Sequence, residues 1–274
     1  MKHALRRCLA AFAACGALWG ADTAKAEFLG RSVDDVVQVS FLPGWRLADG
    51  NHMAGIRIAL APGWKTYWRA PGEGGVPTIL QLTEAEGVTG LAIHWPRPKV
   101  FVINGMRSIG YGDVVVLPVE FSLSQGGEIA IEGQIDMGVC LDVCIPITLD
   151  LTGLLPPTPV RVAEIGQSLS NRPFTAAEAG AGQARCAVEP ISDGLRITVT
   201  AAVPDTGSDE TVVLEHHDSA IWVSEAVTER LGTMIRATAD IVPPDQGPFA
   251  LNRSDLRITV IGTRMAIELD GCTG

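Results

Sequence analysis

The chain has 274 residues, of which 47% are hydrophobic, and a formal net charge of −10 at pH 7. Such a chain can build a large core without needing cross-links merely to fold. The acidic excess excludes nucleic acid and anionic membrane surfaces as partners, because both are bound mainly through Lys and Arg. Loss of residues 1–26 would remove four basic and one acidic residue and make the charge −13, which strengthens this exclusion.

The first 26 residues have the pattern of a secretory signal. Three basic side chains lie within residues 2–7, a short apolar run follows, and the stretch ends with small residues at Ala24 and Ala26. This order is typical of a cleaved signal peptide, and the run is shorter than the roughly 20 residues that cross a bilayer. We predict a signal peptide over residues 1–26, a periplasmic protein and no stable membrane insertion. A lipid on Cys15, or a short buried helix, is the alternative.

The chain after residue 26 contains many short runs rich in β-branched residues. Apolar and polar residues alternate in them, and Gly, Pro, Asp and Asn separate them. This pattern predicts an all-β sandwich rather than alternating strands and helices. The expected strands, in chain order, are Val36–Phe41, His52–Leu60, Val114–Phe121, Glu128–Ile135, Leu195–Thr200, Thr211–Leu214, Leu256–Ile261 and Met265–Leu269.

A segment without strand character separates two groups of these strands. It begins with prolines from Pro156, and Val160–Leu169 then spaces its apolar residues about one helical turn apart. A compact domain seldom contains so long a stretch without strands. We therefore predict a first β-sandwich domain at 27–155, a connector with one short helix at 156–185, and a second β-sandwich domain at 186–274.

Four cysteines follow the predicted signal, and an even number in an exported protein indicates two disulfides. Cys140 and Cys144 can bond only if the chain bends sharply, since a disulfide needs Cα atoms about 4.4–6.8 Å apart. So small a ring stabilises little, whereas two neighbouring sulfurs suit exchange through a mixed disulfide. A static loop disulfide is the alternative. Cys186 and Cys272 would close a long loop, and we predict a structural disulfide there.

Metal binding is a further alternative for the Cys140–Cys144 segment. Met137 together with the two thiolates would offer a soft donor set that suits Cu(I), so a copper-binding or copper-tolerance protein stays open. A noncatalytic module that docks a redox partner is a third possibility. No cofactor is expected, and no hydrolase pattern is visible. Asp142 is interpreted as a turn residue, and His216 and His217 as surface histidines.

Several motifs occur in a characteristic order along the first half of the chain. They are Pro62–Gly72, Gly75–Thr78, His94–Pro96, Gly110–Tyr111, Leu117–Val119 and Cys140–Pro146. Together they resemble the N-terminal periplasmic domain of the thiol:disulfide interchange protein DsbD family, and most closely its ScsB-like members. The resemblance covers roughly residues 30–155.

The resemblance implies an immunoglobulin-like sandwich in which Cys140 and Cys144 form a redox-active disulfide near one end. It also implies a protein-disulfide reductase or exchange component. The pair would receive electrons from a membrane-embedded DsbD- or CcdA-type reductase, or from a thioredoxin-like protein, and pass them to oxidised periplasmic proteins. We expect the reductant to be a separate polypeptide, and the resemblance favours Cys144 as the nucleophile.

The resemblance also assigns aromatic side chains to the surroundings of the cysteine pair. Family members shield the pair with a loop that bears an aromatic residue, and Phe101 stands at the corresponding place. Tyr67, Trp68 and Tyr111 stand where aromatic residues surround the family's site. Lys99 departs from the pattern, because the family's best-studied members carry acidic residues just before the cap aromatic.

Overall fold

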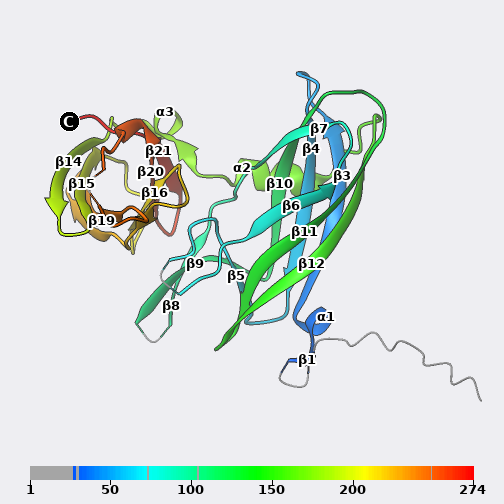
Figure 1. Cartoon of the computed structure of the whole chain (residues 1–274), viewed down its shortest axis with the longest axis horizontal. Coiled ribbons are helices and arrows are strands. Elements are labelled where there is room, and N and C mark those ends of the chain that lie inside the picture. The colour runs from blue at the N-terminus through cyan, green and yellow to red at the C-terminus, as the bar shows by residue number, and fades with distance from the viewer. Residues whose placement is uncertain (1–26, 29–30, 73, 104, 248) are drawn as a thin grey trace, which may run out of the picture.

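A computed structural model describes residues 27–28, 31–72, 74–103, 105–247 and 249–274. It shows two β-sandwiches built almost entirely from antiparallel strands and joined by the helix α2 (Ala163–Ser170), as Figure 1 shows. The prediction of two all-β sandwiches joined by a short helix is therefore confirmed. The predicted signal peptide and Cys15 lie outside the described residues. Within the described part of the chain, no helix is long and apolar enough to cross a membrane.

The N-terminal sandwich packs two sheets face to face. Its elements are β1 (Glu27–Phe28), β2 (Arg31–Ser32), α1 (Val33–Val36), β3 (Val37–Arg46), β4 (His52–Leu60), β5 (Lys65–Tyr67), β6 (Ile79–Glu84), β7 (Val88–Ile93), β8 (Lys99–Ile103), β9 (Met106–Gly112), β10 (Val114–Leu123), β11 (Ile129–Cys140) and β12 (Cys144–Leu155). One sheet has the order β3-β4-β10-β7. The other has the order β12-β11-β5-β9-β8, with β6 also paired to β11.

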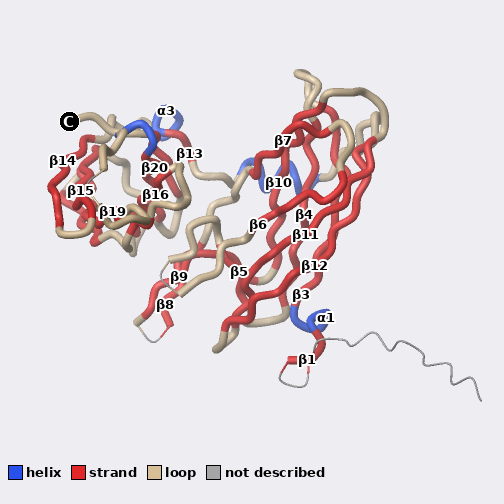
Figure 2. Tube along the Cα trace, in the orientation of Figure 1, coloured by secondary structure: helices blue, strands red, loops and turns tan. Residues whose placement is uncertain are grey.

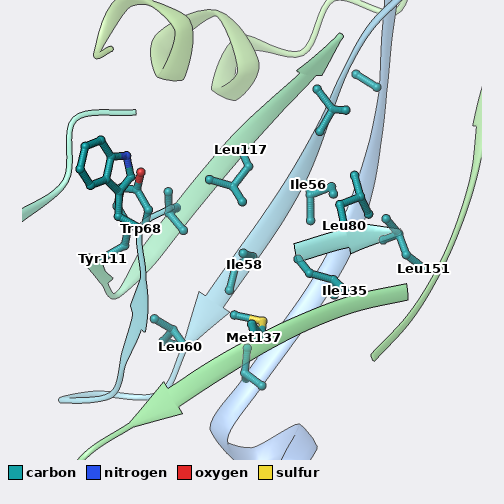
Figure 3. Close-up of a cluster of buried hydrophobic side chains, with 14 of the residues drawn as sticks. Ile56, Ile58, Leu60, Trp68, Leu80, Tyr111, Leu117, Ile135, Met137 and Leu151 are labelled. Carbon is teal, nitrogen blue, oxygen red and sulfur yellow. The ribbon is translucent and has the colours of Figure 1, made fainter. Parts of the chain in front are cut away.

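The core between these sheets follows from the two-residue period of the strands. On β11 the side chains of Ile129, Ile131 and Ile135 are buried, while those of Glu132 and Gln134 between them face solvent. Successive side chains of a strand point to opposite faces of the sheet, so such a sequence buries one face. Figure 3 shows the buried cluster that results, with side chains from both sheets between the strands.

The C-terminal sandwich repeats this two-layer plan around a second core. Its elements are β13 (Phe174–Thr175), α3 (Ala176–Ala179), β14 (Arg185–Ile191), β15 (Gly194–Ala202), β16 (Thr211–His216), β17 (Trp222–Val223), β18 (Val227–Leu231), β19 (Met234–Val242), the 3-10 turn η1 (Arg253–Asp255), β20 (Leu256–Ile261) and β21 (Ala266–Asp270). The sheet orders are β13-β21-β20-β16 and β14-β15-β19-β17, with β18 also beside β19. Figure 2 shows how strands dominate both sandwiches.

The segment predicted as a connector is divided between the two sandwiches. Ile165 of α2 is fully buried against Met53 and Val116 of the N-terminal sandwich. The short strand β13 pairs in parallel with β21 of the C-terminal sandwich, and α3 follows it. The limits 27–155 and 186–274 for the two domains stay predictions.

The two sandwiches contact each other through charged and apolar side chains. Arg69, two residues after β5, donates hydrogen bonds to Glu215 at 2.9 Å and to Glu268 at 2.5 Å, both in the C-terminal sandwich. Its side chain is only 15% exposed. Ile261 and Ala266 of the C-terminal sandwich join the core cluster of the N-terminal one. A part-buried ion-pair cluster and an apolar contact thus link the segment after β5 to the second sandwich.

Candidate functional site

The cysteine pair lies at the tip of the β11–β12 hairpin. Cys140 ends β11, Cys144 begins β12, and the two are register partners across the antiparallel pair. Three residues, Leu141, Asp142 and Val143, make the turn between them. The Cα atoms are 4.2 Å apart and the sulfurs are bonded, which is close to the roughly 4.5 Å spacing of a non-hydrogen-bonded antiparallel pair. A tight hairpin therefore supplies the sharp bend that the spacing of the two cysteines required.

The two sulfurs differ in their access to solvent. Cys140 is 4% exposed, whereas Cys144 lies on the exposed part of the hairpin. Leu141 and Val143 beside it are 39% and 61% exposed. Thiol–disulfide exchange requires an attacking thiolate to reach one sulfur along the S–S axis. Of the two, Cys144 offers that access and Cys140 is enclosed by protein.

The hydroxyl of Tyr67 touches both sulfurs. Its oxygen is 2.8 Å from Cys140 Sγ and 2.7 Å from Cys144 Sγ. A disulfide sulfur carries no hydrogen, so the phenol is the donor, and its single O–H is shared between the two sulfurs, with the carbonyl of Gly74 as a further acceptor at 3.3 Å. Burial raises the pKa of Tyr67 above its ordinary value, and the hydroxyl therefore keeps its proton at neutral pH. The site thus presents a fixed O–H donor to whichever sulfur becomes negatively charged.

The ring of Tyr67 fits a narrow slot made by two glycines. A Cβ on Gly138 would lie 2.9 Å from the ring, and a Cβ on Gly75 would lie 2.8 Å from it. Side-chain hydrogen bonds hold β5, the strand that carries Tyr67, on both sides. Thr66 donates one to the carbonyl of Gly138, and Thr78 donates one to the carbonyl of Tyr67. These contacts leave little freedom for the phenol and explain why small residues stand beside it.

The β8–β9 hairpin, in which the predicted cap residue Phe101 lies, is the next unit of the same sheet beyond β5. Phe101 is half-buried on β8, and the ammonium of Lys65 lies 5.0 Å from the centroid of its ring. Lys65 is itself the register partner of Cys140 across the β5–β11 pair. Burial lowers the pKa of Lys65, and the nearby carboxylate of Asp142 acts in the opposite direction. Lys65 therefore connects the two hairpins: it pairs with Cys140 through its backbone and contacts the Phe101 ring through its ammonium.

The other two aromatic residues assigned to the site lie in the core beside it. Trp68 is fully buried, and the guanidinium of Arg69 lies 4.3 Å from its ring. Tyr111 on β9 is buried and donates its hydroxyl to the carbonyl of Pro96 at 2.8 Å. Tyr67 points to the sulfurs, while Trp68 next to it points to the opposite face of the sheet, as neighbouring strand residues do. Figure 3 shows Trp68 and Tyr111 in the cluster.

Met137, the third donor of the copper alternative, also belongs to the core. It is 1% exposed among the apolar residues of the sandwich interior, as Figure 3 shows. Met137 stands three positions before Cys140, so the two side chains leave β11 on opposite faces. Among the described residues, no group of three or more His, Cys, Asp or Glu side chains could hold a metal ion. The copper alternative therefore lacks its thioether on the cysteine face.

The second disulfide lies in the other sandwich. Cys186 on β14 bonds to Cys272 across 86 residues of sequence, with their Cα atoms 5.8 Å apart. Cys186 is 4% exposed and belongs to the C-terminal core, against which Cys272 packs. The bond ties the segment after β21 to β14.

Sequence reasoning missed Lys65, although the residue stands inside the Pro62–Gly72 motif. The signal was its position two residues before Tyr67, which places both side chains on one face of a strand. The register that brings Lys65 to Cys140 spans 75 residues of sequence and follows only from the pairing of β5 with β11.

Fold and site together define a class: an all-β sandwich protein with a disulfide at a hairpin tip, one sulfur exposed and both sulfurs hydrogen-bonded by a buried phenol. Residues 33–156 match the family model for the thiol:disulfide interchange protein DsbD, N-terminal. The resemblance to that family, which the sequence motifs predicted over roughly residues 30–155, is confirmed for this part of the chain.

A solved structure is similar over nearly the whole chain. The crystal structure of the N-terminal periplasmic domain of ScsB from Proteus mirabilis matches with a TM-score of 0.65 and 23% sequence identity. The match covers 92% of this chain and 98% of that one. At this identity the likeness shows the fold, and its coverage extends that fold to both sandwiches. No curated protein matches the sequence.

Proposed function

We propose that the protein is a periplasmic thiol:disulfide interchange protein that carries electrons through Cys140 and Cys144. The donor is a membrane-embedded or thioredoxin-like reductase, and the acceptors are oxidised periplasmic proteins. The observation that carries the proposal is the asymmetric disulfide, with Cys144 exposed, Cys140 buried and the Tyr67 hydroxyl on both sulfurs. The signal-like sequence at residues 1–26 supports the compartment, as does the similar periplasmic domain.

In the first half-reaction the protein is reduced. A thiolate of the reductase attacks Cys144 Sγ, the exposed sulfur, and forms a mixed disulfide while Cys140 leaves as a thiolate. The second thiol of the reductase loses its proton to water or buffer and attacks its own neighbouring sulfur, which releases Cys144 as a thiolate. Two electrons have then moved to the Cys140–Cys144 pair, and the reductase holds the new disulfide.

In the second half-reaction the pair reduces a substrate. The Cys144 thiolate attacks a substrate disulfide, and one substrate sulfur leaves as a thiolate and takes up a proton. Cys140, as a thiolate, then attacks Cys144 Sγ in the mixed disulfide and releases the second substrate thiolate, which also takes up a proton from water or buffer. The Cys140–Cys144 disulfide forms again, and the substrate has gained two electrons and two protons.

The buried sulfur carries negative charge in both half-reactions, first as leaving group and then as attacking group. A thiolate in an enclosed site needs hydrogen-bond donors or nearby positive charge to form readily. The Tyr67 hydroxyl is already within hydrogen-bond distance of Cys140 Sγ, so no reorganisation is needed when the charge develops. This gives the phenol a chemical role as well as a packing role.

The proposal is tested by trapping with single-cysteine variants of the full chain. Cys140→Ala leaves the exposed Cys144 free, and we expect it to accumulate a mixed disulfide with a thioredoxin-like reductase that non-reducing electrophoresis detects. Cys144→Ala leaves only the buried thiol and should trap far less. If neither variant captures a partner, exchange is the wrong function. A redox titration of the wild type should give a potential above the roughly −300 mV typical of structural disulfides.

A further inference from the structure

Lys65 faces the buried sulfur from the neighbouring strand. It pairs with Cys140 in the β5–β11 register, and directly opposed residues of an antiparallel pair have Cβ atoms about 4.5–5.5 Å apart on the same face. Tyr67, two residues along β5, lies on that face as well and touches Cys140 Sγ. The side chain of Lys65 therefore starts beside the sulfur that becomes a thiolate in both proposed half-reactions.

The other end of the side chain reaches the cap hairpin. The ammonium lies 5.0 Å from the ring centroid of Phe101 on β8, which is within the roughly 6 Å range of a cation–π contact. Asp142, in the turn between the two cysteines, is an acidic group close enough to influence the ammonium. One half-buried cation thus lies between the cysteine hairpin and the cap aromatic.

The use of lysine here is unusual for this chain. Residues 27–274 contain 15 arginines but only two lysines, Lys65 and Lys99. A lysine ammonium is a compact point charge on a flexible stem, whereas an arginine carries a planar fork that suits paired carboxylates. Several arginines bind a carboxylate through two nitrogens, as Arg69 and Arg230 do. A point charge suits a single sulfur anion.

We propose that Lys65 is a positioning residue of the exchange reaction: its ammonium stabilises the Cys140 thiolate and holds the Phe101 ring at the site. The inference rests on the proposed function, because it assigns Lys65 a part in that reaction. In the disulfide state the ammonium lies over the Phe101 ring and within electrostatic range of Asp142. When Cys140 becomes a thiolate, its negative charge becomes a further partner for the Lys65 ammonium.

The charged and titratable groups around Cys140 define which controls are needed. Tyr67 lies on the same strand as Lys65, and Asp142 and Cys144 belong to the cysteine hairpin itself. On β9 the positions opposite Lys65 and Tyr67 are glycines, Gly112 and Gly110. Beyond them on β8 lies Lys99, two strands away from Tyr67. Lys99 is exposed on the cap hairpin and is the matched control lysine.

The first test measures the acidity of the Cys140 thiol in the reduced full chain. The rate of alkylation at Cys140 is followed against pH by mass spectrometry for wild type, Lys65→Met, Lys65→Arg and Lys99→Met. A nearby opposite charge lowers a pKa by about 1–3 units, so Lys65→Met should raise the thiol pKa by about one unit, roughly a tenfold loss of thiolate at neutral pH. Lys65→Arg should restore most of it, and Lys99→Met should change nothing. An unchanged pKa in Lys65→Met overturns the proposal.

The second test follows the environment of the lysine ammonium directly. Reductive methylation with carbon-13 labels the few lysines of the chain, and Lys→Arg variants assign their NMR signals. The Lys65 signal should be shifted by the Phe101 ring, should lose that shift in Phe101→Leu, and should move again on reduction of the Cys140–Cys144 disulfide. The Lys99 signal should stay in place. If the chemical shift of Lys65 is unchanged both in Phe101→Leu and on reduction of the disulfide, the proposal is contradicted.

These tests separate failure of the inference from failure of the proposed function. Neither the thiol pKa nor the lysine signal depends on a redox partner. If Lys65→Met raises the thiol pKa while no partner is ever trapped, the role of Lys65 holds and the exchange function fails. If partners are trapped but Lys65→Met keeps the wild-type thiol pKa, the exchange function holds and Lys65 has no part in it.

Discussion

The chain makes the same covalent bond twice, in opposite settings. Cys140–Cys144 joins residues four apart at a hairpin tip, with one sulfur exposed and a phenol hydroxyl on both. Cys186–Cys272 joins residues 86 apart, and its sulfurs pack in or against the core of the second sandwich. Loop length decides how much a disulfide restricts the unfolded chain, and access decides how readily it exchanges. By both measures the first bond is suited to chemistry and the second to stability.

The largest expected effect comes from breaking the second disulfide. The variant Cys186→Ala/Cys272→Ala should lose about 4–5 kcal/mol of unfolding free energy, because a loop of this length is released in the unfolded state. Urea denaturation measures the loss. The matched variant Cys140→Ala/Cys144→Ala opens a much smaller loop and should lose about half as much or less. Equal losses in the two variants would remove the distinction between a structural and a reactive disulfide.

The contact between the sandwiches should show the next largest effect. Arg69→Met leaves Glu215 and Glu268 close together without their shared cation, and removal of one partner from a buried ion pair costs about 3 kcal/mol or more. Thermal unfolding should therefore shift to lower temperature. Arg196→Met removes an exposed pair with Asp240 and should cost less than about 1 kcal/mol. An equally small loss at Arg69 would show that its ion pairs do not hold the sandwiches together.

A smaller effect is expected at the phenol beside the sulfurs. Tyr67→Phe keeps the ring in its glycine slot but removes the donor to both sulfurs, and one net hydrogen bond is worth about 0.5–1.5 kcal/mol. The rate of disulfide reduction by a small thiol should fall up to about tenfold, as stopped-flow kinetics would measure. Tyr111→Phe loses a hydroxyl bound to a backbone carbonyl instead. It should change stability but not the exchange rate, and a slowed reaction there would contradict the assignment.

The smallest expected effect is a pH dependence within the second sandwich. Burial alone would raise the pKa of Glu210, but hydrogen bonds from Arg230 and Thr206 outweigh it and hold the pKa below its usual value. A depressed folded-state pKa stabilises the fold above the unfolded value of about 4.3, and that stability is lost as the pH falls through the folded pKa. In Glu210→Gln the free energy of unfolding should therefore fall less steeply than in the wild type as the pH is lowered below about 4.3. If the free energy of unfolding depends on pH equally in the variant and the wild type, the lowered pKa of Glu210 is contradicted.

Sequence alone could predict those strands whose residues alternate clearly. His52–Leu60 and Leu256–Ile261 appear in the structure with the expected bounds, because alternation and flanking turn residues mark them locally. β5 escaped prediction, since it has three residues and stands in a segment rich in glycine, proline and tryptophan. β12 escaped as well, because Pro146 breaks its pattern and it lies mostly exposed along the sheet.

The site was predictable to a similar extent. The bend between Cys140 and Cys144 followed from the geometry of a disulfide, and the resemblance pointed to Tyr67. The contact of Lys65 with the site, and that of Arg69 with Glu215, join residues 75 and 146 positions apart. Such contacts depend on which strands become neighbours, and no local pattern of residues encodes that choice.

Three consecutive side chains make a direct mechanical connection through the molecule. Tyr67 holds the sulfurs, Trp68 is locked in the core, and Arg69 is anchored to the second sandwich. Two peptide units span at most about 7 Å, so the residue that anchors the second sandwich lies within that distance of the backbone that carries the phenol. The segment that supplies the hydrogen-bond donor to the hairpin disulfide is thus the same segment that fastens the two sandwiches to each other.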